Sequence, residues 1–351
     1  MDGRPTVILD AMGAEMGGEE VVRGAAQACA ASRGNPFDLV LVTTEPEQME
    51  SHVDRLLSKA ANGSRCNVEI LPAEDHIPET VESPVEVYKK HPNLSIRVAM
   101  DRAKATAECA VVSPGNTGLV MTSAVLTLGR VKGIERPPIG TPMPTLGKEL
   151  FFVDGGSNVD CRASHLYQFA VLAHLYVKAI GGVQRPSIAL LSNGSEAYKG
   201  NAVVREAYSL LSEDRDLNFV GFTEGHTALA GELDIMVCDG FLGNIFLKAA
   251  EGVAETMKTM LREEIKASYI SALAAKTFMG GAFARFARRI DYAQFGGAPL
   301  LGLNGNVVIC HGRSTAIAIK NALLLGCKLA RSGISKLVAR YLQDHYQLVK
   351  V

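Results

Sequence analysis

Residues 110–118 read AVVSPGNTG, and this short stretch indicates the fold because it passes from a strand through a tight turn into a helix. Residues 110–113 are apolar enough for a strand that is buried on both faces. The two glycines suit a tight turn, and the apolar side chains of residues 118–128 have helical spacing. A buried strand that leads into a helix is the repeating unit of α/β folds.

The same unit recurs along the chain. Runs typical of buried strands follow at residues 6–9, 39–42, 67–71, 150–153, 188–191, 217–220, 235–238 and 307–310, with helical stretches such as residues 18–32 between them. Continuous apolar runs favour parallel strands with helices on both faces. We therefore predict an α/β fold with a doubly wound, largely parallel sheet, in a single domain over residues 1–351. Residues 136–148, rich in proline and glycine, are a candidate crossover.

Composition excludes several classes of protein. The 351 residues are 47% hydrophobic and carry a net charge of -1, which argues against a general nucleic-acid binder. The seven cysteines are scattered without a CxxC pair, so we expect free thiols in a reducing compartment rather than a metal site or a disulfide framework. We see no signal peptide, and no apolar run reaches the ~18 residues that span a bilayer. The expectation is a cytoplasmic protein without a metal or cofactor.

One region departs from the strand–helix alternation. Residues 244–267 have helical spacing, and the apolar stretch that follows breaks at Gly280-Gly281 before it resumes. We predict a protruding apolar helical hairpin over residues 245–290. It has two interpretations: packed core or a dimer contact, or a surface that touches lipid or an acyl chain.

The turn at residues 113–118 is the clearest candidate for an anion site. It precedes a helix, so free backbone N–H groups and the helix dipole favour a negative charge there. Ser113 and Thr117 add hydroxyl groups, and Asn116 tolerates unusual backbone angles. The turn lacks the lysine of a P-loop. A plain turn remains the alternative.

Other strand ends carry polar residues of a similar kind. Ligands of doubly wound folds bind at the carboxyl ends of strands, which is where Lys199, Asp239, Asn244 and His311 are expected. A Gly-x-Ser-x-Gly motif is missing, which argues against a serine nucleophile. These residues favour chemistry by positioned donors, a cation and a bound anion, without a covalent enzyme intermediate.

Taken together, these turns resemble those of the PlsX-type acyl-ACP:phosphate acyltransferases over about residues 6–329. The motifs that carry the resemblance stand in the family's order: Asp10-Ala11-Met12-Gly13, Ser113-x-Gly115-Asn116-Thr117-Gly118, Gly133-Ile134-x-Arg136-Pro137, Asn158-Val159-Asp160-Cys161, Glu196-x-x-Lys199-Gly200, Cys238-Asp239-Gly240-Phe241-x-Gly243-Asn244 and Gly296-Gly297-Ala298-Pro299-Leu300-Leu301-Gly302.

The resemblance implies a fold of the isocitrate/isopropylmalate dehydrogenase-like type and a homodimer. It implies that inorganic phosphate attacks the thioester that joins a long-chain acyl group to acyl carrier protein. The products would be free carrier protein and acyl phosphate, which is used for phospholipid synthesis. Lys199 and Asn244 would be the catalytic residues. The residues implied to bind phosphate or acyl phosphate are Ser113, Gly115, Asn116, Thr117, Asp239 and His311.

The same resemblance implies a membrane contact through the hairpin and a peripheral location at the cytoplasmic face. The product would pass to a membrane glycerol-phosphate acyltransferase. Basic residues around the apolar segment suit anionic lipids or the acidic helices of a carrier protein. The residues expected at this membrane or carrier contact are Leu273, Lys276, Phe278, Arg285, Arg288 and Arg289.

The chain departs from the usual family pattern in several places without changing the fold prediction. The departures are Ala14, Glu15, Met16, Pro114, Ser192, Ser195 and Arg313. Arg313 adds a positive charge that suits either phosphate or the carrier protein.

Three other functions compete with this one. A phosphotransacetylase-type acyltransferase would use acyl-CoA with a short acyl group, which requires no lipid-facing hairpin. An NAD-dependent decarboxylating dehydrogenase would require clustered aspartates and arginines, which the sequence does not show. A non-catalytic scaffold for lipid enzymes would not require Lys199 and Asn244.

Overall fold

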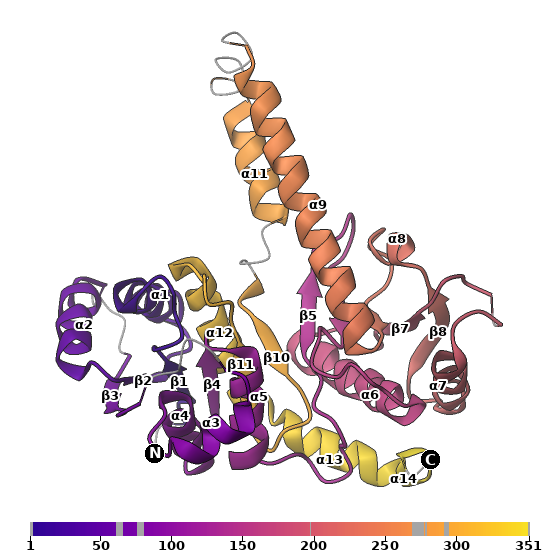
Figure 1. The fold of residues 1–351 in the computed structure, drawn as a ribbon, viewed down its shortest axis with the longest axis horizontal. Helices are drawn as coiled ribbons and strands as arrows, with labels where there is room; N and C mark the ends of the chain where they lie inside the picture. Colours follow the sequence, from indigo (N-terminus) through magenta and orange to yellow (C-terminus); the bar gives the residue numbers. More distant parts are fainter. Residues whose placement is uncertain are drawn as a thin grey trace.

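The protein folds around two β-sheets that lie next to each other (Figure 1). The structure is a computed structural model, and it describes residues 3–60, 66–75, 81–196, 198–268, 277, 279–290 and 295–349. The first sheet has the order β10-β11-β4-β1-β2-β3. Its strands are β1 (Thr6–Asp10), β2 (Asp38–Thr43), β3 (Val68–Pro72), β4 (Cys109–Ser113), β10 (Ala298–Leu300) and β11 (Asn306–Ile309).

The second sheet has the order β5-β6-β9-β7-β8. Its strands are β5 (Gly140–Met143), β6 (Leu150–Val153), β7 (Ser187–Leu191), β8 (Asn218–Thr223) and β9 (Ile235–Val237). The prediction of a largely parallel α/β fold is confirmed, because only the pairs β10–β11 and β5–β6 are antiparallel among the paired strands described. The prediction of one sheet differs from the structure, which has two.

The two sheets meet at their antiparallel edges. Ile139, just before β5, forms an antiparallel bridge with Leu300 of β10, and the Leu301 N–H donates to the Pro138 carbonyl at 2.9 Å. Three antiparallel steps separate β11 from β6. The parallel strands of the second sheet therefore run in the direction opposite to those of the first.

Helices cover the sheets. Those associated with the first sheet are α1 (Gly18–Ala31), α2 (Pro46–Ala60), α3 (Pro84–Lys90), α4 (Ser95–Lys104), α5 (Thr117–Thr127) and α12 (Ala316–Ser332). The others are α6 (Ala163–Ile180), α7 (Ala202–Glu213), α8 (Gly225–Ala228), α9 (Gly240–Lys266), α11 (Gly280–Ile290), α13 (Ile334–Asp344) and α14 (Tyr346–Val349).

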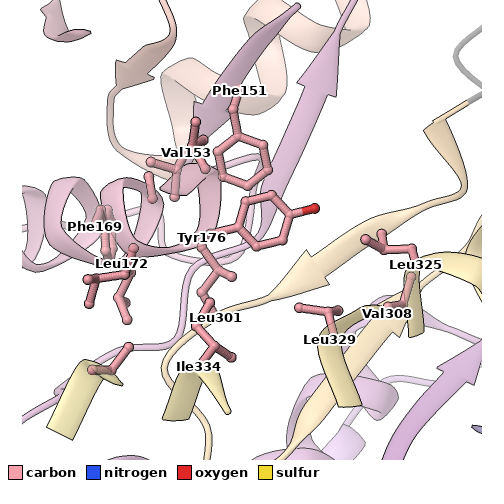
Figure 2. Packing of buried hydrophobic residues seen from close by; sticks show 14 of the residues in the cluster. Phe151, Val153, Phe169, Leu172, Tyr176, Leu301, Val308, Leu325, Leu329 and Ile334 are labelled. Atoms are coloured by element: carbon pink, nitrogen blue, oxygen red, sulfur yellow. The ribbon is translucent and has the colours of Figure 1, made fainter. Parts of the chain in front are cut away.

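One hydrophobic core joins the two sheets. Phe151 of β6 stacks on Tyr176 of α6 with ring centroids 4.4 Å apart, and the same cluster reaches Val308 of β11 (Figure 2). Every residue of α6 from Ala163 to Val177 is buried. A helix that is buried on all sides is usually apolar all round, and α6 is mostly so, with four buried polar residues, Ser164, His165, Gln168 and His174. Burial of α6 therefore holds the two sheets in one packed unit.

α9 behaves in the opposite way. It projects away from the sheets (Figure 1), and Gly240 and Gly243 are its buried residues. The predicted helix at residues 244–267 is confirmed, but α9 starts four residues earlier. α11 begins at Gly280. Leu273, Lys276 and Phe278 lie outside the described residues, so the tip of the predicted hairpin does too.

The expectation that all seven cysteines are free thiols was wrong for two of them. Cys29 in α1 and Cys66, just before β3, form a disulfide bond. They are 37 residues apart in sequence, so only the packing of α1 beside the β2–β3 edge brings them together. The other cysteines, Cys109, Cys161, Cys238, Cys310 and Cys327, are free.

His174 of α6 supplies a pH prediction. Its side chain is 4% exposed, and Nδ1 has no hydrogen-bond partner among the described residues. Burial, and then the charge of Lys178, lowers the pKa of His174 below the ordinary 6.5, against the opposite effect of Asp214 and Asp216. The unfolded chain binds this proton more readily, so stability is present above about pH 6.5 and is lost as pH falls below it. We expect the free energy of unfolding, measured in urea, to decrease as the pH is lowered below about 6.5.

His174→Phe should reduce that decrease, because it removes the proton-binding group. His226→Phe, at an exposed histidine of α8, is the control and should retain the wild-type pH dependence. An acid-induced loss of stability that is identical in His174→Phe and wild type would contradict the prediction.

Candidate active site

The first group of candidate residues lies where β1, β4 and β11 end. These strands are parallel neighbours with β4 in the middle, so their carboxyl ends meet at one edge. Ser113 is fully buried; its hydroxyl donates to Asp10 Oδ2 at 2.8 Å and accepts from the Gly115 N–H at 3.1 Å. Burial raises the pKa of Asp10, with opposing hydrogen bonds from Ser113 and others. The two hydrogen bonds of the Ser113 hydroxyl therefore stabilise the turn on its buried side.

The turn at residues 113–118, called the β4 turn below, packs backbone against backbone. The loop that follows β1, called the β1 loop below, contains Gly13. A Cβ added to Gly13 would lie 2.3 Å from the Gly115 Cα, so only glycine fits at this position. Asn116 is the N-cap of α5 and accepts from the Leu119 N–H at 3.1 Å. Asn116 and Thr117 are exposed. The free N–H groups at the start of α5 thus face solvent, as an anion site requires.

His311 and Arg313 follow β11 at the same edge. His311 is exposed, and its Nδ1 accepts from the Arg313 N–H at 3.4 Å. The Arg313 side chain pairs with Glu15 of the β1 loop, with Nε 3.1 Å from Oε2. His311, the β4 turn and the β1 loop are therefore neighbours, as the sequence predicted.

The second group lies where β6, β9 and β7 end, and Asp154 organises it. Asp154 is fully buried, and its carboxylate accepts from the Ile139 N–H at 2.9 Å and from the Asn158 N–H at 2.7 Å. It also accepts from the Ser157 hydroxyl, at 2.7 Å to Oδ1, and from the Asn158 side-chain amide at 2.8 Å. Sequence reasoning missed Asp154 as a site residue, although its position directly after an apolar strand was a usable signal.

α9 begins against this loop. A Cβ on Gly243 would lie 1.9 Å from the Asp154 carbonyl oxygen, which explains the glycine. Asp239 is half-buried and caps α9 by accepting from the Leu242 N–H at 2.9 Å. Asn244 is exposed, and its Cβ would be 3.2 Å from a Cβ on Gly156. The close packing fixes Asn244 at the rim of the loop after β6.

Lys199 lies in the loop after β7. It is half-buried, and its Cγ would be 2.8 Å from a Cβ on Gly194. The Lys199 side chain therefore packs directly against the backbone of Gly194. Its ammonium nitrogen is 5.4 Å from the centroid of the Tyr198 ring. β7 and β6 are both parallel neighbours of β9. Lys199 and Asn244 therefore come from adjacent strand ends.

The thiols near this second group are poor nucleophiles. Burial, followed by the charges of Asp154 and Asp239, raises the pKa of Cys161 to about 12. Burial also raises the pKa of Cys238. Since the thiolate is the reactive form, neither residue is suited to form a covalent acyl intermediate near neutral pH.

The contacts described here link residues within each group rather than across the two. The sequence places Ser113, Lys199, Asp239 and His311 after the carboxyl ends of strands, and this is correct for each sheet separately. The motif Gly296-Gly297-Ala298-Pro299-Leu300-Leu301-Gly302 instead contains β10. Because strand direction reverses between the sheets, Lys199 and Asn244 belong to one group and the β4 turn with His311 to the other.

The residues predicted at a membrane or carrier contact are described only in part. Arg289 of α11 donates from Nη2 to the carbonyl oxygens of Thr145 and Leu146, in the loop between β5 and β6. Arg285 is exposed, and the side chain of Arg288 is not among those described. Exposed apolar side chains of α9, of α11 and of the residue just before α11 include Val253, Met257, Met260, Leu261, Met279 and Phe286. Among the described residues, none of the helices combines the length and the hydropathy that crossing a membrane requires.

One cluster with metal-ligand chemistry was not predicted. Asp214, Asp216 and His345 place one ligand atom each within 4.8 Å of one another. The Asp214 carboxylate also accepts from the Tyr167 and Tyr341 hydroxyls, each at 2.8 Å. These contacts anchor α13 to α6 and to the end of α7. The residues are too far apart in sequence for spacing to reveal the cluster.

Comparison with known proteins shows the family of the chain. Residues 6–337 match the family described as fatty acid synthesis protein. The chain is 40% identical over 343 residues to a phosphate acyltransferase of Trichlorobacter lovleyi, covering 97% of this chain and 95% of the relative. It is 41% identical over 331 residues to the phosphate acyltransferase of Dictyoglomus turgidum, covering 94% and 95%.

Among solved structures, a phosphotransacetylase from Streptococcus pyogenes is similar with a TM-score of 0.60 at 20% identity, covering 93% of this chain and 94% of that one. The EutD phosphotransacetylase from Staphylococcus aureus is similar with a TM-score of 0.58 at 15% identity, covering 93% and 94%. At these identities the likeness shows the α/β fold alone.

Proposed function

Because the chain belongs to the fatty acid synthesis protein family, whose members named above are phosphate acyltransferases, we propose that it transfers a long-chain acyl group from acyl carrier protein to inorganic phosphate. The observation that carries the proposal is the position of Lys199 and Asn244 after adjacent strands, with the start of α9, which carries Asn244, packed against the Asp154 loop. We infer the isocitrate/isopropylmalate dehydrogenase-like fold type on the same grounds.

In this mechanism the phosphate and the thioester lie between the two groups of residues and contact both, and a phosphate oxygen attacks the carbonyl carbon of the thioester. The carbon–sulfur bond then breaks, and the thiolate leaves with the carrier protein and takes up a proton. The Lys199 ammonium stabilises the negative charge of phosphate and of the tetrahedral oxyanion, and the Asn244 amide donates to the carbonyl oxygen. The enzyme forms no covalent bond to the acyl group, in agreement with the raised pKa values of Cys161 and Cys238.

A direct assay tests this function. Purified protein receives palmitoyl-acyl carrier protein and labelled phosphate, and acid-labile acyl phosphate is measured. We expect labelled product with this donor. The second candidate, suggested by the phosphotransacetylase fold neighbours, is transfer from a short acyl-CoA. Acetyl phosphate from acetyl-CoA, with none from the palmitoyl donor, would replace our proposal by the second candidate.

The exposed apolar face of α9 supports a peripheral membrane contact. Val253, Met257 and Met260 are 56%, 65% and 61% exposed and lie on one side of the helix. Such a face, with basic residues of α11 nearby in sequence, suits a membrane with anionic lipids. Contact with the membrane would also bring the acyl phosphate to a membrane glycerol-phosphate acyltransferase.

Met257→Glu should reduce sedimentation with anionic liposomes several-fold, because it adds charge to the apolar face. Thr259→Glu is the matched control, since residue 259 lies ~200° around the helix from residue 257. Unchanged sedimentation together with a shift from dimer to monomer would instead assign this face to a homodimer contact.

A further inference from the structure

The Arg313–Glu15 ion pair crosses the candidate anion site. Arg313 follows β11 and Glu15 follows β1, while β4 lies between these two strands in the sheet. A contact between the loops of the two outer strands must pass beside the carboxyl end of the middle strand. The pair therefore lies next to the β4 turn.

Backbone contacts fix both ends of this bridge. The Glu15 N–H donates to the Gly312 carbonyl at 2.9 Å, and a Cβ on Gly312 would lie 2.7 Å from Glu15 Oε1. The Cys310 N–H donates to the Ser113 carbonyl at 2.8 Å, which joins the β11 loop to the β4 turn. The loops that carry Arg313 and Glu15 are consequently held next to each other and next to the β4 turn.

The pair is nevertheless easy to open. The side chains of Arg313 and Glu15 are 80% and 58% exposed. Exposed ion pairs contribute little free energy, because water solvates both charges. Glu15 contacts the guanidinium through Nε alone among the described contacts, so the outer nitrogens remain available as donors. A phosphate dianion offers a stronger, bidentate partner for such a fork.

His311 contributes a donor to the same place. Its Nδ1 accepts from the Arg313 N–H, so in the neutral ring the proton is on Nε2. His311 Nε2–H, the Arg313 guanidinium and the N–H groups of the β4 turn are therefore three sets of donors on neighbouring loops at the carboxyl ends of β11 and β4. Glu15 is the acidic residue that competes there.

We propose that Arg313 captures inorganic phosphate at the β4 turn, and that Glu15 competes with phosphate for the Arg313 guanidinium. This inference rests on the proposed function, because it assigns Arg313 to the phosphate substrate, where the sequence left the choice between phosphate and the carrier protein open, and adds Glu15 as a competitor. It makes opposite predictions for the two members of the ion pair.

Phosphate binding is measured first, without turnover, from the increase in the unfolding temperature with phosphate at constant ionic strength. Arg313→Ala should raise the phosphate concentration needed for half the effect about tenfold, as expected for loss of a charge-assisted hydrogen bond. Arg313→Lys should restore part of the affinity. Glu15→Gln should lower that concentration several-fold. Arg102→Ala is the control and should match wild type. It removes an exposed ion pair with Glu69 of β3, which is separated from β4 in the sheet by β1 and β2.

Kinetics separate this inference from the proposed function. In the acyl phosphate assay, Arg313→Ala should raise the KM for phosphate with little change in kcat, because the contact is made before and during the reaction. If Arg313→Ala and Glu15→Gln shift phosphate affinity in the same direction, or if neither shifts it, the inference is wrong and the pair only joins loops. If the binding shifts are opposite but wild type forms no acyl phosphate, the proposed function fails and the phosphate site stands.

Discussion

Replacing Lys199 by alanine is expected to lower kcat for acyl phosphate formation by about 10²–10³-fold, the usual cost of losing one preorganised donor to a developing charge. The side chain is half-buried and packs against the backbone of Gly194, so its ammonium is positioned before the substrate arrives. Removing it leaves the oxyanion without this charge. The measurement is the initial rate at saturating palmitoyl-acyl carrier protein and phosphate.

Two further variants define what the lysine does. Lys199→Arg keeps the charge but not the compact ammonium, and should recover only part of the rate. Lys248→Ala removes a lysine of α9 that already pairs with Glu251 at 2.8 Å, and should leave kcat unchanged. Wild-type kcat in Lys199→Ala would exclude the proposed role.

Asp154→Ala is expected to have the largest effect on stability, about 3–5 kcal/mol in the free energy of unfolding. The substitution would leave the Ile139 and Asn158 N–H groups and the Ser157 hydroxyl without their common acceptor in the interior. The loop that positions Asn244 would lose its support at the same time. Urea unfolding followed by circular dichroism gives the stability, and the assay above gives the rate.

Asp154→Asn keeps the size and one acceptor oxygen, so it should lose less stability than Asp154→Ala. Asp101→Ala, at an exposed carboxylate of α4, controls for the loss of one negative charge. If Asp154→Ala and Asp101→Ala have the same free energy of unfolding, the buried hydrogen bonds of Asp154 do not contribute the expected stability and the prediction is wrong.

Most of the strands that the sequence predicted correctly have continuous apolar runs, and β3 and β8 were found although they contain Glu69 and Asn218. β5 and β10 were missed because each is short and contains a proline, Pro142 or Pro299, which removes a backbone donor. These two strands join the sheets, so missing them also hid the reversal of strand direction. Pairing between strands depends on contacts across the whole chain, which local pattern does not record.

For the candidate site, the sequence located the turns but not their internal hydrogen bonds. Ser113 was expected to offer a hydroxyl to the ligand, and it instead donates to Asp10, which is 103 residues away. The roles of Lys199 and Asn244 remain predictions. The disulfide between Cys29 and Cys66 was missed for the same reason, since only folding reveals which distant residues meet.

The chain order of the strands has a consequence for biosynthesis. The five strands of the second sheet are contiguous in the sequence and have all been synthesised by residue 237. The first sheet is split: β4 must wait for β11, and α1 and β4 must wait for α12, which packs on both and ends at Ser332. On the ribosome the second sheet therefore has its strands available first. The apolar surfaces of the first sheet stay incomplete until the last part of the chain emerges.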